Sequence, residues 1–202
     1  MARNEIRDAR PGDEIAALLR LLAPVIWDRY AGGRAAAERL LARLVPRPRH
    51  TVSFDCCLLA LAGGEPVGVL AGYPRREEAL RGRRFTTLSL PRLRPRQWPA
   101  AWAILRAGDD LRPRQRRDAW YVDSLAVAPT HRRRGVARAL LEAAAERARA
   151  DGCPAVAIDT DLDNDAAQAT YAALGFARGE AIAYEGDRYV PGPGTVGFSR
   201  TV

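Results

Sequence analysis

From residue 120 onwards, the sequence alternates between short apolar runs and amphipathic helical patterns. The first run ends before Pro129, and the helical pattern after it carries Val136, Ala139, Leu140 and Ala143 on one face. Strands are predicted at residues 120–127, 155–160, 181–185 and 195–200, and helices at residues 135–150 and 165–173. This order predicts an α/β fold, because each amphipathic helix needs a sheet on which to bury its apolar face.

The N-terminal half carries weaker signals. A strand is predicted at residues 5–9, and Asp13 is placed to cap a helix over residues 14–22. The other predicted elements of this half are a helix at residues 34–45 and a hairpin of strands at residues 54–61 and 67–73.

The composition is that of a globular protein with a buried core. At 202 residues, with 48% hydrophobic and 28% charged residues, the chain fits one domain. No run of about 18 apolar residues occurs, and the first ten residues are too charged for a secretory signal. Cys56, Cys57 and Cys153 lack the spacing of metal ligands. We therefore expect a reduced, cytoplasmic protein without a membrane segment or a metal site.

Every basic residue is an arginine, and the charge is unevenly distributed. Residues 75–117, called the Arg-rich segment below, hold 13 arginines and 4 acidic residues, whereas the rest of the chain holds 19 and 20. The formal net charge of +8 therefore originates in this segment. We interpret it as a partly helical insertion in a single domain over residues 1–202. Its helix is predicted from apolar residues at helical spacing, namely Trp98, Ala101, Trp102 and Leu105.

The connection between the strand at 120–127 and the helix at 135–150 has features of an anion-binding loop. A helix N-terminus carries unpaired N–H groups and about half a positive charge. Gly135 lets the backbone approach a ligand, and the arginines at 132–134 are donors suited to a diphosphate. The structural alternative, a solvated arginine cluster before an ordinary helix, stays open on this loop alone.

Three linked motifs resemble those of the GNAT superfamily of N-acetyltransferases. Arg132-x-x-Gly135-x-Ala137 matches the signature Q/R-x-x-G-x-G/A, and the run that ends at Val127 looks like the family's fourth strand. The pattern N-x-x-A-x-x-x-Y-x-x-x-G-F is matched by Asn164, Ala167, Tyr171, Gly175 and Phe176. The resemblance is strong over residues 119–177, weaker before residue 75 and absent from the Arg-rich segment.

The resemblance implies a fold and a cofactor site. The implied fold is a mixed, mostly antiparallel sheet of six to seven strands flanked by helices, with strands 4 and 5 splayed to form a CoA cleft. Pantetheine would lie along strand 4, where the N–H of Val127 would also stabilise the oxyanion formed on attack. The implied acetyl-CoA-binding residues are Leu125, Ala126, Val127, Arg132, Arg133, Arg134, Gly135, Val136, Ala137, Arg138, Asn164 and Tyr171.

Acetyl transfer also needs groups that move protons. The departing thiolate benefits from a proton donor, and the attacking amine must be neutral. Asn164 and Tyr171 lie two helical turns apart and share a face, so we expect the Tyr171 phenol to protonate the CoA sulfur. A core role for this tyrosine is the structural alternative.

Asp123 is the expected general base. We expect it to be in phase with Leu125 and Val127 along the cofactor strand, although a polar residue that supports a neighbouring loop explains it equally well. Glu180 is a weaker candidate for the base, and His131 is expected to pack beside the loop rather than to catalyse.

The sequence thus predicts an acetyl-CoA-dependent N-acetyltransferase that acts on a small-molecule or peptide amine in a ternary complex. The alternative is a catalytically inert CoA-sensing or interaction module on the same fold. Nucleic-acid binding through the Arg-rich segment ranks below both, since we interpret that segment as a lid on the substrate side whose charge reflects composition. A homodimer is left open.

Overall fold

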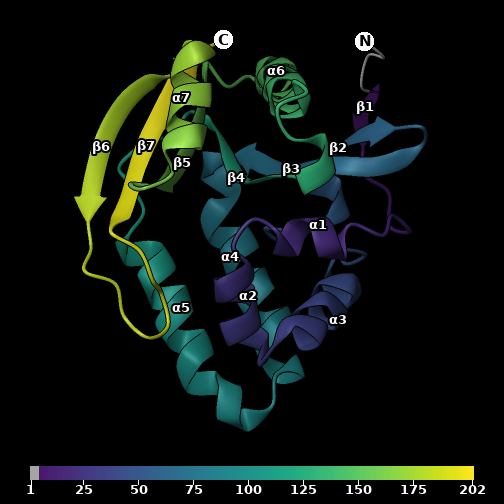
Figure 1. Cartoon of the computed structure of the whole chain (residues 1–202), viewed down its shortest axis with the longest axis vertical. Coiled ribbons are helices and arrows are strands. Elements are labelled where there is room, and N and C mark those ends of the chain that lie inside the picture. Colours follow the sequence, from purple (N-terminus) through teal and green to yellow (C-terminus); the bar gives the residue numbers. More distant parts are fainter. Residues whose placement is uncertain (1–4) are drawn as a thin grey trace.

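Seven strands form one sheet through the middle of the molecule (Figure 1). The structure is a computed structural model and describes residues 5–202; residues 1–4, part of the start for which no secretory signal is expected, lie outside the described residues. The strand order is β1-β2-β3-β4-β5-β7-β6. The strands are β1 (Glu5–Asp8), β2 (Cys57–Ala62), β3 (Glu65–Pro74), β4 (Trp120–Val127), β5 (Ala155–Asp161), β6 (Ala177–Ala183) and β7 (Gly194–Thr201).

Helices cover both faces of the sheet because its strands alternate their side chains between two apolar cores. Along β2, Leu58 and Ala60 belong to one core, while Leu59 and Leu61 belong to the other. The first core packs against α6 and α7, and the second against the other helices (Figure 1). The helices are α1 (Ala16–Arg20), α2 (Pro24–Ala31), α3 (Arg34–Leu44), α4 (Glu78–Ser89), α5 (Trp98–Asp110), α6 (Val136–Ala150) and α7 (Asp165–Ala173).

The sheet divides between β4 and β5. These two strands pair in parallel at three positions only, the last being Val122 with Ile158, whereas every other neighbouring pair is antiparallel. Beyond Val122, β4 continues beside β3 alone, while β5 continues beside β7. The edges of β4 and β5 that face each other therefore have no strand partner there. The predicted mixed sheet with splayed fourth and fifth strands is confirmed.

The first helix is shorter than predicted, and the prediction that Asp13 caps it is wrong. α1 begins at Ala16 without a side-chain cap. The Asp13 carboxylate instead accepts two hydrogen bonds from the Arg7 guanidinium, at 2.7 and 2.8 Å, and one from the backbone N–H of Arg10. Its side chain therefore fixes the turn after β1, because the guanidinium of Arg7 competes for the oxygens that a cap would need.

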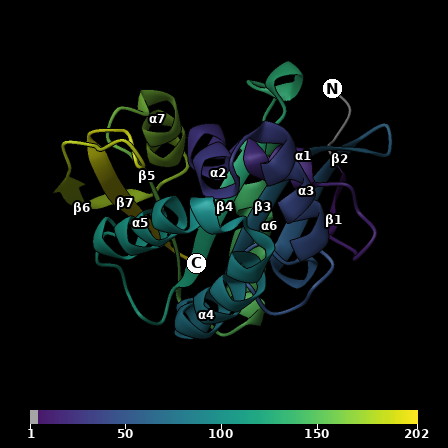
Figure 2. The same ribbon diagram turned by 90° about the horizontal axis from the view of Figure 1, so that it is seen from below.

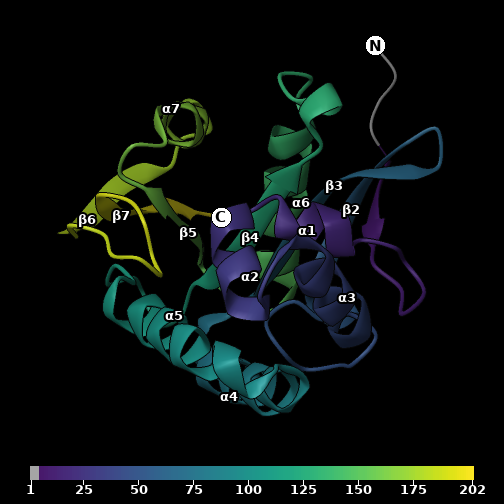
Figure 3. The ribbon, with the colours of Figure 1, turned by 60° about the horizontal axis from the view of Figure 1, so that its bottom comes forward.

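The Arg-rich segment folds into two α-helices and three short 3₁₀ turns, of which only α5 was predicted from sequence. α4 has few apolar residues, and its anchor is Phe85, whose ring lies 6.0 Å from Trp27 and 5.9 Å from Tyr30 of α2. Figures 2 and 3 show α4 and α5 running past α2. That the segment is an insertion in a single domain stays a prediction.

Neither a membrane span nor a metal cluster is found among residues 5–202. Their helices are too short or too polar to cross a bilayer, and no three of their His, Cys, Asp or Glu side chains group as ligands. The three cysteines are buried and free.

Candidate active site

Asp123 occupies a β-bulge at the point where β4 leaves β5. Ala71 of β3 pairs with Ser124, and the next residue, Gly72, pairs with Val122, so that Asp123 is the extra residue. The bulge reverses the alternation of β4. Leu125 and Val127 face the core under α6, whereas Asp123 faces the opposite core, where Tyr73 lies. The prediction that Asp123 is in phase with Leu125 and Val127 is therefore wrong.

The Asp123 carboxylate is half-buried, with 16% of its side chain exposed, and has several partners. The Tyr73 hydroxyl donates to it at 2.9 Å, the Ser124 hydroxyl donates at 3.3 Å, and the Arg112 guanidinium lies 4.0 Å away. Burial raises the pKa of Asp123 above its usual range, while Arg112 and the two hydroxyls oppose that rise. A carboxylate with a raised pKa is a stronger base than an ordinary one.

Asp159 is a second half-buried carboxylate at the point where β4 and β5 separate, called the fork below, and sequence reasoning missed it. It follows Ile158, the last β5 residue that pairs with β4, and accepts a hydrogen bond from the Tyr121 hydroxyl. Burial raises the pKa of Asp159 as well. The only signal in the sequence was an aspartate directly after the apolar run of residues 155–158. Its closeness to Asp123 follows from strand pairing, which the sequence alone does not reveal.

Two arginines of the Arg-rich segment hold this cluster together. The guanidinium groups of Arg75 and Arg112 lie over the Tyr121 ring, 5.3 and 5.1 Å from its centroid. Both also contact Glu78, Arg75 at 3.5 Å and Arg112 more closely. With Asp123 and Asp159, the cluster therefore has three carboxylates against two guanidinium groups.

A cavity of about 1360 Å³ opens in front of Asp123 and Ser124. Its walls come from α2, α4 and α5, on the face of the sheet opposite α6. Two of these helices belong to the Arg-rich segment. The interpretation of the segment as a lid on the substrate side stays a prediction.

The start of α6 has the geometry of an anion site. Gly135 adopts a left-handed φ of 80°, Arg133 has a φ of 59°, and no side chain caps the first N–H groups of the helix. Backbone that alternates in this way turns successive N–H groups inward, a concave arrangement that binds anions. The first turn also contains no acidic residue. The residues present therefore fit a diphosphate.

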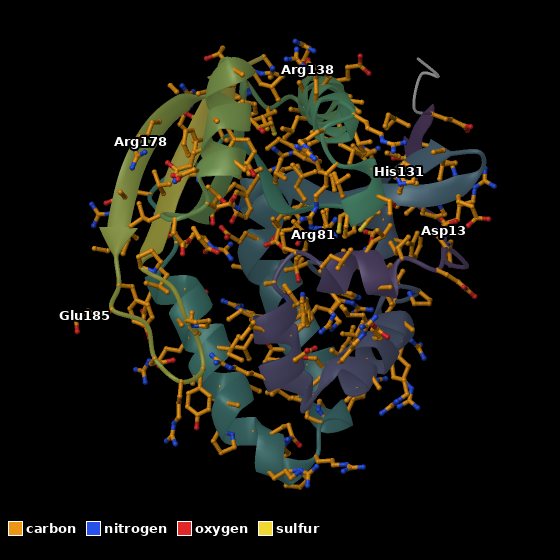
Figure 4. The ribbon with its side chains drawn as sticks, viewed as in Figure 1. Asp13, Arg81, His131, Arg138, Arg178 and Glu185 are labelled. Atoms are coloured by element: carbon orange, nitrogen blue, oxygen red, sulfur yellow. The ribbon has the colours of Figure 1, made fainter. Side chains whose placement is uncertain are left out.

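The side chains of this loop differ in how they are placed. Arg132, Arg133, Arg134 and Arg138 are exposed, and Figure 4 shows Arg138 at the outer surface beside α6. Arg132 also donates to the backbone oxygen of Val127 at 3.2 Å, which joins the loop to β4. Three further members of the predicted set, Ala126, Val136 and Ala137, are buried or half-buried and offer backbone atoms.

Tyr171 lies on the α7 side of the fork. Its ring packs against Phe176 and Phe198, with centroids 6.0 and 5.5 Å away, and 6% of its surface is exposed. Within residues 5–202 its hydroxyl has no hydrogen-bond partner, and it is not sealed from solvent. Burial and the nearby charge of Asp159 raise the pKa of Tyr171, which keeps the phenol protonated at neutral pH.

The other predicted candidates have identifiable structural roles. The Asn164 side chain caps α7 by accepting from the N–H of Ala167 at 3.2 Å, and it donates to Thr160 at 3.0 Å. Glu180 is exposed on β6 and accepts from the backbone N–H of Arg114. His131 lies in the turn before the loop (Figure 4), and its Nδ1 is 3.0 Å from the hydroxyl oxygen of Thr130.

Comparisons with known proteins agree with this architecture. A model of the Acetyltransferase (GNAT) family matches residues 26–176. No curated protein matches the sequence. Among solved structures, an acetyltransferase aligns with a TM-score of 0.71 at 22% identity, over 98% of this chain and 99% of its own.

Two further structures share the fold at similar distance. An N-acetyltransferase from Staphylococcus aureus Mu50 has a TM-score of 0.65 at 19% identity, over 97% of this chain and 100% of its own. An agmatine N-acetyltransferase has a TM-score of 0.58 at 19% identity, with both chains fully covered. At these identities the likeness shows the fold alone. Because the family model covers most of the chain, this protein belongs to the GNAT acetyltransferase family.

Proposed function

We propose that the protein is an acetyl-CoA-dependent N-acetyltransferase that moves the acetyl group directly to a primary amine in a ternary complex. The observation that carries the proposal is the bulge in β4, which turns Asp123 towards a large cavity while Leu125 and Val127 face α6. One strand thereby separates an acceptor side from a donor side.

The donor side suits acetyl-CoA. The diphosphate lies on the N–H groups of residues 133–138, and pantetheine lies along the unpaired edge of β4 at Leu125, Ala126 and Val127. The backbone N–H of Val127 is the donor to the oxyanion. The exposed arginines of the loop add charge-assisted hydrogen bonds to phosphate. Asn164 contacts the pantetheine in addition to capping α7.

On the acceptor side, Asp123 takes a proton from the ammonium group of the substrate. The neutral nitrogen attacks the acetyl carbonyl carbon, a new C–N bond forms, and the C–S bond breaks. The departing thiolate takes the phenolic proton of Tyr171. The new amide nitrogen loses its extra proton to the tyrosinate, and Asp123 returns its own proton to solvent. Asp123 is preferred to Asp159 as the base because it lines the cavity.

The second candidate function is an inert CoA-sensing module of the same family. The Tyr171 hydroxyl argues against it, because it is open to solvent and makes no hydrogen bond within the described residues, which leaves it free to donate to a bound sulfur.

Two measurements separate the candidates. Acetyl-CoA binding is measured by thermal shift, and CoA thiol release is then followed across a panel of primary amines. An enzyme shows amine-dependent release that drops in Asp123→Asn. A sensor binds acetyl-CoA and releases no thiol with any amine, and Tyr171→Phe leaves its basal acetyl-CoA hydrolysis unchanged. Failure to bind acetyl-CoA contradicts both.

A further inference from the structure

The walls of the acceptor cavity that lie away from Asp123 are largely apolar. Ile26 and Trp27 of α2, Phe85 of α4, and Trp102 and Leu105 of α5 line it. Its volume, about 1360 Å³, exceeds the range of about 300–1000 Å³ that is usual for small-molecule sites. The cavity is therefore large enough for an acceptor with a bulky body. Burial of that body's apolar atoms against the apolar walls would stabilise the complex.

Trp102 identifies the apolar wall as a contact surface for a ligand. Its side chain lines the cavity and is 56% exposed, and Leu22, which also lines the cavity, is 40% exposed. Exposed apolar side chains that gather around a cavity are a usual sign of a binding surface. Trp98 on the same helix is 46% exposed but does not line the cavity, which makes it a natural control.

The charges that line the cavity disfavour a second ammonium group. Arg75 and Arg112 both lie against Glu78 and the Tyr121 ring, and Arg112 also lies 4.0 Å from Asp123, while Nη1 of Arg75 has no hydrogen-bond partner within the described residues. The charged side chains left over are two arginines and one aspartate, namely Arg83, Arg106 and Asp109. All three are exposed. A substrate cation beyond the reacting amine therefore meets a net positive lining, and like charges repel.

From these observations we infer the acceptor class, on the basis of the proposed N-acetyltransferase function. The acceptor is a primary amine with an aromatic or aliphatic body and no second positive charge. Its amino group lies at Asp123 and its body against Trp102 and the apolar face of α2. The lining of the cavity disfavours polyamines and guanidinium-bearing amines.

The first test compares amines that differ in one feature. Hexylamine and 1,6-diaminohexane have the same chain and differ in the second charge, and tryptamine replaces the chain by an aromatic body. We expect kcat/KM for hexylamine to exceed that for the diamine by about tenfold, and tryptamine to be the best of the three. Raising the salt concentration should narrow the gap between hexylamine and the diamine, since exposed charges are screened.

Matched variants test the two walls separately. Trp102→Ala should lower kcat/KM for tryptamine by about tenfold and for hexylamine less, whereas Trp98→Ala should leave the preference unchanged. Arg106→Glu should bring the diamine to within a few-fold of hexylamine. Arg117→Glu makes the same charge change at an exposed site outside the cavity, so it should leave the ratio as it is.

Binding of each amine is also measured by calorimetry without acetyl-CoA, so that the acceptor class is tested even if no transfer occurs. Equal or tighter binding of the diamine overturns the inference and leaves the enzyme function standing. Preferential binding of the monoamines without any acetyl transfer supports the inference and contradicts the proposed function. An unchanged tryptamine preference in Trp102→Ala also overturns the inference.

Discussion

At the scale of single residues, the surroundings of Asp123 decide the pH at which it can accept a proton. Burial raises its pKa, and a base works only above its pKa. We therefore expect kcat/KM to fall on acidification at a pH above about 4, the ordinary range of an aspartate. Asp123→Asn should lower kcat by about 10²–10⁴-fold. Steady-state rates of thiol release across pH measure both effects.

The matched control is Asp109→Asn, which changes a carboxylate that lines the same cavity but is exposed. It should leave the acid limb of the pH profile in place. Near wild-type turnover in Asp123→Asn would assign the base to another group, and Asp159 would be the next to test.

Tyr171 allows catalysis to be separated from folding. Because its hydroxyl has no partner within the described residues, Tyr171→Phe removes no hydrogen bond and should leave the Tm unchanged. We expect kcat for amine acetylation to fall by about 10²-fold. Thermal unfolding and thiol release on the same preparation check this. A variant of unchanged Tm and unchanged kcat would make Tyr171 a core residue only.

Single residues also show where sequence reasoning reaches its limit. Tyr171 and Asp123 were selected from sequence, because each stands in a motif or on a strand with strong local signals. The face of the sheet on which the Asp123 side chain lies was predicted wrongly, because a β-bulge depends on how the partner strand pairs. Asp159 was missed for the same reason: it becomes part of the site only when β5 pairs with β4.

At the scale of elements, the N-terminus of α6 is predicted to hold the diphosphate. Gly135 adopts a φ of 80°, and a Cβ added there would meet no atom within 4 Å, so Gly135→Ala introduces backbone strain of about 1–2 kcal/mol and no clash. We expect the Kd for acetyl-CoA to rise about tenfold, since the N–H groups lose their alignment. Calorimetric titration with acetyl-CoA measures it.

Gly152, at the other end of α6, provides the comparison. Its φ is 70° and the space around it is also open. Gly152→Ala should therefore destabilise the protein by a similar amount without changing the affinity for acetyl-CoA. Equal affinities for acetyl-CoA in the two variants would show that the start of α6 does not bind the diphosphate.

Elements with clear boundary signals were predicted best. β4 and α7 match their predicted bounds, because Pro129 follows the strand and Asn164 caps the helix. α2 was not predicted, although Pro24 at its first position and Gly32 after its end are ordinary helix boundaries. α4 lacks a clear apolar stripe, and its position depends on contacts with α2. Both helices line the acceptor cavity, so the shape of the acceptor side could not be predicted from the sequence.

At the scale of the whole molecule, the Arg-rich segment joins the acceptor wall to the chemistry at the fork. Its exposed arginines account for the basic character of the protein, while Arg75 and Arg112 are taken into the carboxylate cluster. The segment is therefore both a wall of the cavity and a source of positive charge beside the base.

Arg112 makes this connection testable. Its charge lowers the pKa of Asp123, so Arg112→Gln should let that pKa rise further and shift the acid limb of the kcat/KM profile to higher pH. Arg112→Lys, which keeps the positive charge, should return the acid limb of the kcat/KM profile close to its wild-type pH. Since the Gln variant removes one of the two guanidinium partners of Glu78, a lower Tm is expected alongside. Arg117→Gln removes an exposed charge from the same segment and should change neither quantity. A lower Tm in Arg112→Gln with an unmoved pH profile would make Arg112 a structural residue and would separate the Arg-rich segment from the catalytic base.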